Sequence, residues 1–391
     1  MSRPEISIDV VQVVTQAAKH RAARKFLRHC SLLFKGIMQP ALLYKTLDNH
    51  GVQCHLCQRR CIIASGKSGY CGTRRNVDGE LFSSIYGHVS SLRISPIEIK
   101  PLFHFFPGSQ WLSMGSLGCN FLCAGCQNWE IAHADVEKGL SSLRFITPEE
   151  SVRLAREDHC KGISWTYNEP TLWFEYTLDS AKRAREAGLL TNYVTNAYMT
   201  IEALDLLGPY LNAFRADLKG FSADTYKRIA NIKDFEGILK ILERAKHFWG
   251  MHVEIVTNLI PGINDEKKEL REMAGWIRDR LGPETPWHVT RFVPHFKLSH
   301  LAPTPVARLE EARQMGLEAG LKYVYLGNVP GHPGENTHCT ACGKLLIQRM
   351  NYQILQYHLD GNRCGYCGEP VAGHFESCPP ARGKMITKDR S

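Results

Sequence analysis

Strand-like apolar runs alternate with amphipathic, helix-like runs from residue 111 to residue 329. We expect strands at residues 111–118, 162–169, 189–196, 213–220, 252–262, 287–294 and 323–329. Helices are expected at residues 147–160, in a run ending at 187–188, and at 201–211, 223–249 with a break near Asn231, 266–281 and 305–320. Thr147, Pro148 and Glu150 give one helix a capping box and a proline in its first turn. Six strand-helix units and a last strand predict an α/β fold with parallel strands.

Polar residues follow the predicted strands at their carboxyl ends. These residues are three cysteines, Asn168, Glu169, Thr195, Asn196, Asp217, Lys219, Asn258 and His295. Helix caps and turns also favour Asn and Asp, so each position alone is ambiguous. Together they predict an active site, because chemistry in βα folds collects at the carboxyl ends of strands.

The three cysteines are Cys119, Cys123 and Cys126, spaced C-x3-C-x2-C in a loop. A [4Fe-4S] cluster normally takes four thiolates, so three leave one iron open to a small molecule. A zinc knuckle or a chance grouping is the alternative. Zinc requires a fourth ligand nearby, and none lies between Gln127 and His133. The spacing therefore favours a cluster with one open iron.

Two further cysteine groups flank this region. Cys54, Cys57, Cys61 and Cys71 fall within eighteen residues. Four ligands would close such a site around zinc or a second iron-sulfur cluster, for scaffolding or electron relay.

The second flanking group is a pair of C-x-x-C-G knuckles, which contain Cys339, Cys342, Cys364 and Cys367. Their β-rich spacer predicts a zinc ribbon. His338, His374 and Cys378 are substitute ligands, which keeps an auxiliary cluster open.

Composition and charge limit the class of protein. The 391 residues include 14 cysteines, no signal peptide and no apolar run of about 20 residues, so we expect a cytoplasmic protein without a membrane span. A net charge of +9 indicates solubility or attraction of an acidic electron donor such as flavodoxin or ferredoxin. The sequence has no dense Lys/Arg face interleaved with aromatic residues, so we do not expect nucleic-acid binding.

The chain divides into five predicted regions. These are a basic helical extension (1–40), a cysteine-rich module (41–110), a barrel (111–330), a double-knuckle module (331–378) and a tail (379–391). Within the second region, residues 94–109 read as a strand and turn that pack aromatics into a core. His104 in this segment is interpreted as structural.

The motifs together resemble the AmmeMemoRadiSam-system radical S-adenosylmethionine (SAM) enzymes, which are related to pyruvate formate-lyase activating enzymes. The matching stretches are VQCHLCQRRC, GYCGTRRN, SPIEIKPLFHFFPGS, GCNFLCAGCQNWEIA, TYNEPT, YVTNAY, ADLKG, TNLIPGIND, WHVTRFVP, YVYLGNVPG and the terminal knuckles. They cover roughly residues 41–373. The resemblance implies a partial (βα)6 barrel, open at one side.

The resemblance also implies roles for single residues. The triplet binds the cluster, Glu169 with Asn168 takes the SAM amino group, and Asn196 lies near the ribose. Asp217 and Lys219 orient the methionine carboxylate, and His295 is a further candidate contact. Many relatives carry an aromatic residue against the adenine just before the third cysteine, whereas this chain has Gly125.

The resulting hypothesis is an activase-like radical SAM oxidoreductase. The resemblance implies that it reductively cleaves SAM to a 5′-deoxyadenosyl radical, which abstracts hydrogen from an unknown substrate, for which a protein is one expectation. Memo-like and AMMECR-like proteins are expected partners through the family name alone. One alternative is a zinc-organised adaptor with structural cysteines only. Another is a thiol oxidoreductase using a C-x-x-C pair, although the knuckles lack the following helix that such a site needs.

Overall fold

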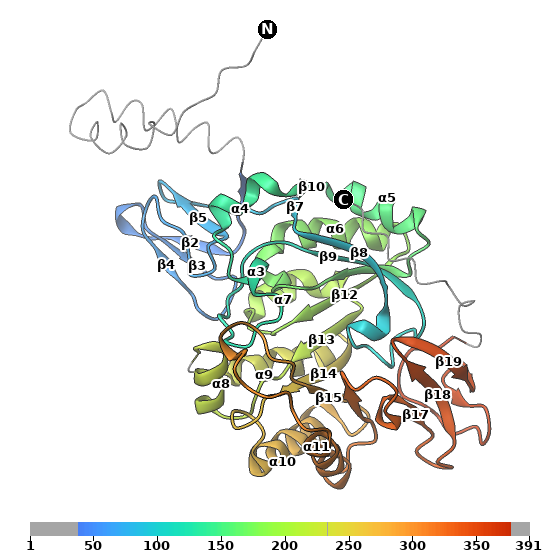
Figure 1. The fold of residues 1–391 in the computed structure, drawn as a ribbon. Coiled ribbons are helices and arrows are strands. Elements are labelled where there is room, and N and C mark those ends of the chain that lie inside the picture. The colour runs from blue at the N-terminus through green and yellow to red at the C-terminus, as the bar shows by residue number, and fades with distance from the viewer. Residues whose placement is uncertain (1–37, 233, 377–391) are drawn as a thin grey trace, which may run out of the picture.

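The computed structural model describes residues 38–376, except residue 233 (Figure 1). The basic helix expected in residues 1–40 lies outside the described residues, apart from the last three positions of that range, and so does the expected tail. No helix in the described part of the chain is long and apolar enough to cross a lipid bilayer.

One eight-stranded sheet forms the centre of the molecule. Its spatial order is β16 (Val324–Gly327), β15 (Trp287–Arg291), β14 (His252–Leu259), β13 (Ala213–Asp217), β12 (Leu190–Thr195), β11 (Gly162–Trp165), β9 (Gln110–Gly115) and β8 (Ser91–Pro96). The seven strands from β9 to β16 pair in parallel, and β8 pairs antiparallel with β9 at the edge. This curved, open sheet confirms the predicted α/β class and partial barrel.

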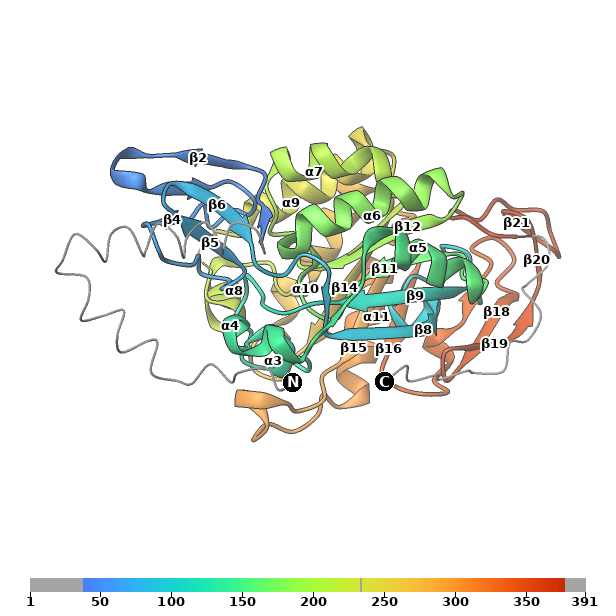
Figure 2. The same ribbon diagram turned by 90° about the horizontal axis from the view of Figure 1, so that it is seen from above.

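Helices connect the strands and cover the outer face of the sheet (Figure 2). They are α5 (Pro148–Glu157), α6 (Phe174–Glu186), α7 (Ile201–Leu207), α8 (Ala223–Ala230), α9 (Glu236–Glu243), α10 (Lys267–Trp276) and α11 (Val306–Glu318), with the short α3 (Trp129–Ala132) and α4 (Val136–Gly139) after β9. Thr147 caps α5 through the amide of Glu150, as the capping box predicts. Asn231 ends α8 in the left-handed conformation at the predicted break.

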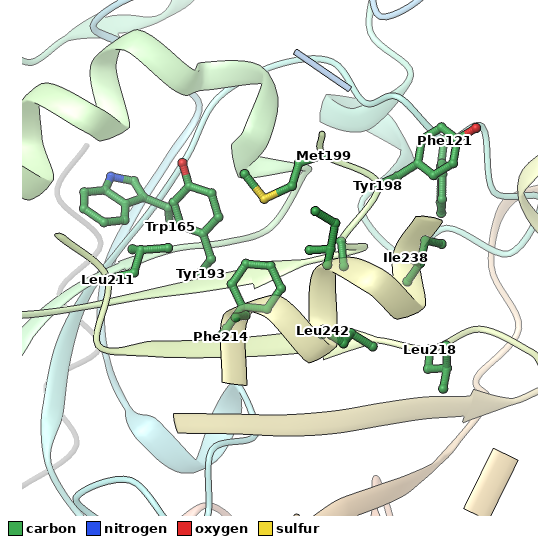
Figure 3. Close-up of a cluster of buried hydrophobic side chains, with 14 of the residues drawn as sticks. Phe121, Trp165, Tyr193, Tyr198, Met199, Leu211, Phe214, Leu218, Ile238 and Leu242 are labelled. Carbon is green, nitrogen blue, oxygen red and sulfur yellow. The ribbon is translucent and has the colours of Figure 1, made fainter. Parts of the chain in front are cut away.

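Alternation along the strands gives the barrel two different faces. Trp165, Tyr193 and Phe214 lie side by side on neighbouring strands and pack toward the helices (Figure 3). The opposite face carries polar residues such as Ser164 and Arg215. A polar interior beneath an apolar shell leaves the inside of the barrel available for chemistry.

Several predicted boundaries were wrong. The strand expected at residues 111–118 ends at Gly115. The chain leaves the sheet there, and Gly118 has a φ of 82°, which a β-strand does not accommodate. Asn258 lies within β14 rather than after it. The sheet also has one more strand than the seven counted, because Ser91–Pro96 pairs with β9 along its whole length.

Two small β modules lie at opposite ends of the barrel (Figures 1 and 2). The amino-terminal module contains β1 (Gln39–Pro40), β2 (Tyr44–Thr46), β3 (Val52–Cys54), β4 (Ile62–Ile63), β5 (Arg74–Val77) and β6 (Glu80–Ser83). The carboxyl-terminal module contains β17 (Thr337–His338), β18 (Leu345–Met350), β19 (Gln353–Tyr357), β20 (Leu359–Asp360) and β21 (Arg363–Cys364). A separate pair, β7 (His88–Val89) and β10 (Arg144–Phe145), closes the connection into the barrel.

Candidate active site and metal centres

The central cysteines lie in the loop between β9 and α3, at the carboxyl edge of the sheet. Burial raises the pKa of the Cys119 thiol well above its ordinary value and that of Cys123 to about 11, and each neighbouring cysteine adds to the effect. Three neighbouring thiols in such surroundings ionise together only if a positive centre binds them. The donor set therefore fits a metal cluster.

Asn168 and Asn196 hold this loop in place from neighbouring strand ends. Asn168 accepts a hydrogen bond from the Ser116 amide (3.1 Å) and donates one to the Gly118 carbonyl (2.9 Å). Asn196 donates to Asn120 Oδ1 (2.7 Å) and accepts from the Tyr198 amide (2.9 Å). Both amide side chains are thus already engaged within the protein, on either side of Cys119.

Glu169 joins the ends of β11 and β12. Its Oε1 accepts hydrogen bonds from Thr171 and from Thr195 Oγ1 (2.7 Å), and its Oε2 accepts one from the Asn196 amide (2.8 Å). Burial raises the pKa of Glu169, which is 2% exposed. Because each carboxylate oxygen accepts about two hydrogen bonds, Oε2 has one acceptor position left for a ligand.

Asp217 and Lys219 extend from the end of β13 toward Cys123. Lys219 Nζ donates to Asp217 Oδ2 (3.0 Å), and Arg215 donates to Asp217 Oδ1 (2.6 Å). Burial alone would raise the pKa of Asp217, but these two cations hold it below its ordinary value. Each Asp217 oxygen thus faces a cation of the protein, and the three-donor ammonium of Lys219 keeps capacity for an anion.

The barrel interior holds a further cation, Lys100. Lys100 Nζ donates to Ser113 Oγ and to Ser95 Oγ (3.1 Å), and its side chain is almost completely buried. Burial, with a contribution from Arg215, lowers the pKa of Lys100 to about 7. Sequence reasoning did not identify Lys100 or Arg215 as part of the site.

The loop after β15 closes one side of the cysteine loop. The Lys297 amide donates to the Ala124 carbonyl (3.0 Å). A Cβ at Gly125 would lie 3.1 Å from both Phe292 and Leu298, so these two side chains fill the space that an aromatic residue would take there. His295 lies in the same loop, immediately before the short 3-10 helix Phe296–Leu298.

The four amino-terminal cysteines line one small pocket, together with Arg59 and Arg74 among others. Arg74 is 1% exposed, its Nη1 lies 4.0 Å from Cys54 Sγ, and its Nε has no hydrogen-bond partner among the described residues. Arg59 extends from the pocket to the Asn120 carbonyl (2.6 Å). The pocket therefore borders the loop of the central cysteines. In the sequence, the only signal for this contact was the presence of charged residues within the cysteine motif.

The carboxyl-terminal cysteines form the compact group that the knuckles predict. Their four sulfur atoms lie within 4.8 Å of one another. Cys339 Sγ lies 3.6 Å from Cys367 Sγ, and Cys342 Sγ lies 3.8 Å from Cys364 Sγ. The substitute ligands His338 and His374 lie outside this group, while Cys378 lies outside the described residues.

The segment before β9 locks this module to the barrel. His104 is fully buried between the Ala372 carbonyl (2.7 Å) and the Tyr325 hydroxyl (2.6 Å), which agrees with its structural interpretation. Glu254 accepts hydrogen bonds from the amides of Phe103 and His104.

Comparison with known proteins places this arrangement in a family. The model of the radical SAM superfamily matches residues 115–274. A protein of unknown role from Methanocaldococcus jannaschii is 44% identical over 85% of this chain and 99% of its own length. The chain belongs to the radical SAM superfamily. Membership implies a [4Fe-4S] cluster and SAM, and the cysteine loop and the three-thiol donor set fit that cluster.

More distant relatives match part of this radical SAM chain. The isethionate sulfite-lyase activating enzyme of Nitratidesulfovibrio vulgaris is 23% identical over 51% of this chain and 66% of its own length. Among solved structures, a domain of a pyruvate-formate lyase-activating enzyme from Bacteroides vulgatus is 20% identical, with a TM-score of 0.36, over 43% of this chain and 99% of that domain. A radical SAM methyltransferase from Sphaerobacter thermophilus is 19% identical, with a TM-score of 0.44, over 62% and 71% of the two chains.

Proposed function

We propose that this protein reductively cleaves SAM and uses the resulting radical to abstract hydrogen from a substrate. The observation that carries the proposal is the meeting of three elements at the carboxyl edge of the barrel: the Cys119, Cys123 and Cys126 loop, the free acceptor position of Glu169, and the ammonium of Lys219 beside Cys123. When bound, the cluster supplies one electron to SAM, which yields methionine and a 5′-deoxyadenosyl radical.

The protein's own side chains then divide into ligand contacts and positioning residues. Glu169 Oε2 receives the SAM ammonium, and Lys219 receives the methionine carboxylate as a point charge. Asp217 orients Lys219, since its Oδ2 accepts a hydrogen bond from the Lys219 ammonium while Arg215 holds its Oδ1. Asn168 and Asn196 act through the cluster loop that they hold, and Asn196 also borders the ribose.

The loop after β15 supplies the remaining wall. Phe292 and Leu298 cover the face at Gly125, and the half-buried Leu298, backed by the fully buried Phe292, offers apolar surface to the adenine in place of the aromatic residue that many relatives carry. His295 lies in this loop and is proposed as a further contact of the cofactor.

The test is anaerobic. The protein is reconstituted with iron and sulfide, reduced with dithionite and mixed with SAM, and 5′-deoxyadenosine is measured by mass spectrometry in wild type and Cys123→Ala. We expect product in the wild type and none in the variant. A wild-type protein that carries zinc in place of iron at this loop would contradict the proposal and favour the zinc-organised adaptor.

The proposal extends to the substrate and the partners. The isethionate sulfite-lyase activating enzyme among the relatives is named for the protein that it activates, and we propose a protein substrate here as well. The electron donor is a flavodoxin or ferredoxin in the cytoplasm, and no membrane or nucleic acid takes part. Memo-like and AMMECR-like partners are tested by a pull-down, and recovery of neither would contradict that part of the proposal.

The compact carboxyl-terminal group is proposed to hold zinc. Tetrahedral zinc with Zn–S bonds of about 2.3 Å places its sulfur atoms about 3.8 Å apart. The observed separations of 3.6 and 3.8 Å match this value.

A further inference from the structure

The amino-terminal cysteines are arranged differently from the carboxyl-terminal ones. All four sulfur atoms of the carboxyl-terminal group fit within 4.8 Å of one another, as a single ion requires. No three sulfur atoms of Cys54, Cys57, Cys61 and Cys71 do so in the described structure, although all four line one pocket. Among the described residues, the three sulfur atoms of the central triplet do not form such a compact group either. Sulfur ligands of an iron-sulfur cube are held apart by the cube itself, whereas one zinc ion draws its ligands together.

Two arginines that line the pocket have buried nitrogen atoms without hydrogen-bond partners among the described residues. Arg74 is fully buried against Glu175, yet its Nε has no partner in the described structure and its Nη1 approaches Cys54 Sγ. Arg59 Nη2 is buried and unpartnered in the same way. Because buried donors without partners are costly, two of them lining one pocket indicate an anionic group inside it. A cube bound by four thiolates is anionic and its sulfur atoms accept hydrogen bonds.

This pocket lies against the central cluster loop. Arg59 lies between Cys57 and Cys61 and donates to the Asn120 carbonyl, one residue after Cys119. A Cβ added to Gly118 would lie 2.8 Å from the Cys71 carbonyl oxygen, so Cys71 packs directly on the residue before Cys119. The two sites are therefore connected by one arginine and by van der Waals contact.

The outer side of the pocket faces solvent. Residues 62–70 pass over it, and Ile62 and Tyr70 are 74% and 40% exposed. Lys67 in the same segment is exposed and adds positive charge. A donor protein with an acidic surface can approach this side of the pocket.

We propose that Cys54, Cys57, Cys61 and Cys71 bind an auxiliary [4Fe-4S] cluster that passes electrons from the donor to the radical SAM cluster. A reduced flavodoxin or ferredoxin loses one electron to the auxiliary cluster. The auxiliary cluster returns to its oxidised state as the radical SAM cluster gains that electron. No proton moves and no bond breaks in this transfer. The relay rests on the proposed function, but the second cluster does not.

Metal analysis of the reconstituted full-length protein tests the site directly. We expect about eight iron atoms per chain in the wild type and about four in the triple variant Cys119→Ser/Cys123→Ser/Cys126→Ser. The double variant Cys61→Ser/Cys71→Ser should also hold about four iron atoms, while Cys160→Ser should match the wild type, because this buried thiol lies in none of the three groups.

Spectroscopy of the triple variant removes the remaining ambiguity. After reduction it should show the EPR signal of a reduced [4Fe-4S] cluster, and SAM should leave that signal unchanged because all four irons are ligated. A triple variant without iron, or a double variant that loses zinc instead of iron, would overturn the assignment. A wild type with about eight iron atoms that produces no 5′-deoxyadenosine would contradict the proposed function alone.

The relay is tested by the rate at which the radical SAM cluster becomes reduced, followed by freeze-quench EPR. With reduced flavodoxin, the Cys61→Ser/Cys71→Ser variant should be slower than wild type by about tenfold or more, whereas dithionite should reduce both at similar rates because it is small enough to reach the cluster directly. Equal rates with flavodoxin would overturn the relay.

Discussion

The two cysteine-rich modules of this chain lie at opposite edges of the same sheet, and their positions separate chemistry from support. The amino-terminal module contacts the carboxyl edge. Cys57 forms an isolated β-bridge with Met199, which follows β12, and the Gln58 amide donates a hydrogen bond to the Tyr198 carbonyl. The carboxyl-terminal module contacts the amino edge, where Lys161, just before β11, pairs with Glu376. Active sites of βα folds lie at the carboxyl edge, and the amino edge serves stability.

The metal arrangement follows the same division. The amino-terminal thiols do not form a compact group in the described structure, and their pocket borders the active-site loop, whereas the carboxyl-terminal thiols are compact and two of them, Cys342 and Cys367, are exposed. Cysteine content alone therefore does not assign a role to either module. The position of each module on the barrel does, and each of the following substitutions tests that difference.

The largest effect is expected from Cys364→Ser at the amino edge. Removing one ligand of the compact group should release its ion and lower the free energy of unfolding by about 5 kcal/mol or more, since binding of structural zinc contributes directly to folding. Zinc content and chemical denaturation measure the two effects.

The same variant should keep the absorption spectrum of the radical SAM cluster, because the module lies at the far edge of the barrel. Cys160→Ser controls for loss of a buried thiol that lies in none of the three groups. Loss of iron rather than zinc from Cys364→Ser would show that the two modules hold the same kind of centre.

A smaller effect is expected from Glu175→Gln, which disrupts the anchor of the amino-terminal module. Glu175 on α6 binds Arg74 and the Leu42 amide, and the Arg74 and Glu175 side chains are only 1% and 3% exposed. Leaving the arginine without a counterion should cost about 3 kcal/mol of unfolding free energy. Denaturation of Glu149→Gln is the matched control, because its pair with Arg183 is exposed and should contribute less than about 1 kcal/mol.

The sequence was sufficient for the parallel architecture and for the thiol groups. Alternating runs identified every parallel strand, and the C-x-x-C-G knuckles predicted the compact group that the structure shows. These features depend on local periodicity and on short spacings, which a single sequence displays.

The contacts between modules were not predictable in the same way. Arg59 and Asn120 are 61 residues apart, and Lys100 meets Ser113 only because β8 reverses direction beside β9. The assignment of Asn168 as a cofactor contact came from resemblance, whereas in the structure both the Oδ1 and the Nδ2 of Asn168 form hydrogen bonds that hold the cysteine loop. Such tertiary hydrogen bonds have no local sequence pattern, and thus only the folded chain identifies them.

Gly118→Ala tests the contact between the amino-terminal module and the cysteine loop. The added Cβ would lie 2.5 Å from Thr73 and 2.8 Å from the Cys71 carbonyl, and the φ of 82° is unfavourable for alanine. We expect a loss of about 2 kcal/mol in unfolding free energy, with a lowered iron content.

Gly188→Ala separates the two causes, because Gly188 has a φ of 74° and open space around its Cα. It should show the backbone strain alone. Equal losses of stability and an unchanged iron content in the two variants would contradict close packing between Cys71 and the cysteine loop.

The smallest effect concerns Lys100, which lies inside the barrel between the two edges. Burial, reinforced by Arg215, lowers its pKa from 10.5 to about 7, so in this range the unfolded chain binds more protons than the folded one. The unfolding free energy is therefore highest above the ordinary pKa of lysine, where Lys100 is neutral in both states, and it declines as the pH falls toward 7. Between pH 7 and pH 9 the unfolding free energy of the wild type should rise by on the order of 1 kcal/mol relative to Lys100→Met. Chemical denaturation across this range measures the difference. Lys240→Met, on the exposed side of α9, controls for the loss of a surface charge. Parallel pH profiles for wild type and Lys100→Met would mean that Lys100 stays charged inside the barrel.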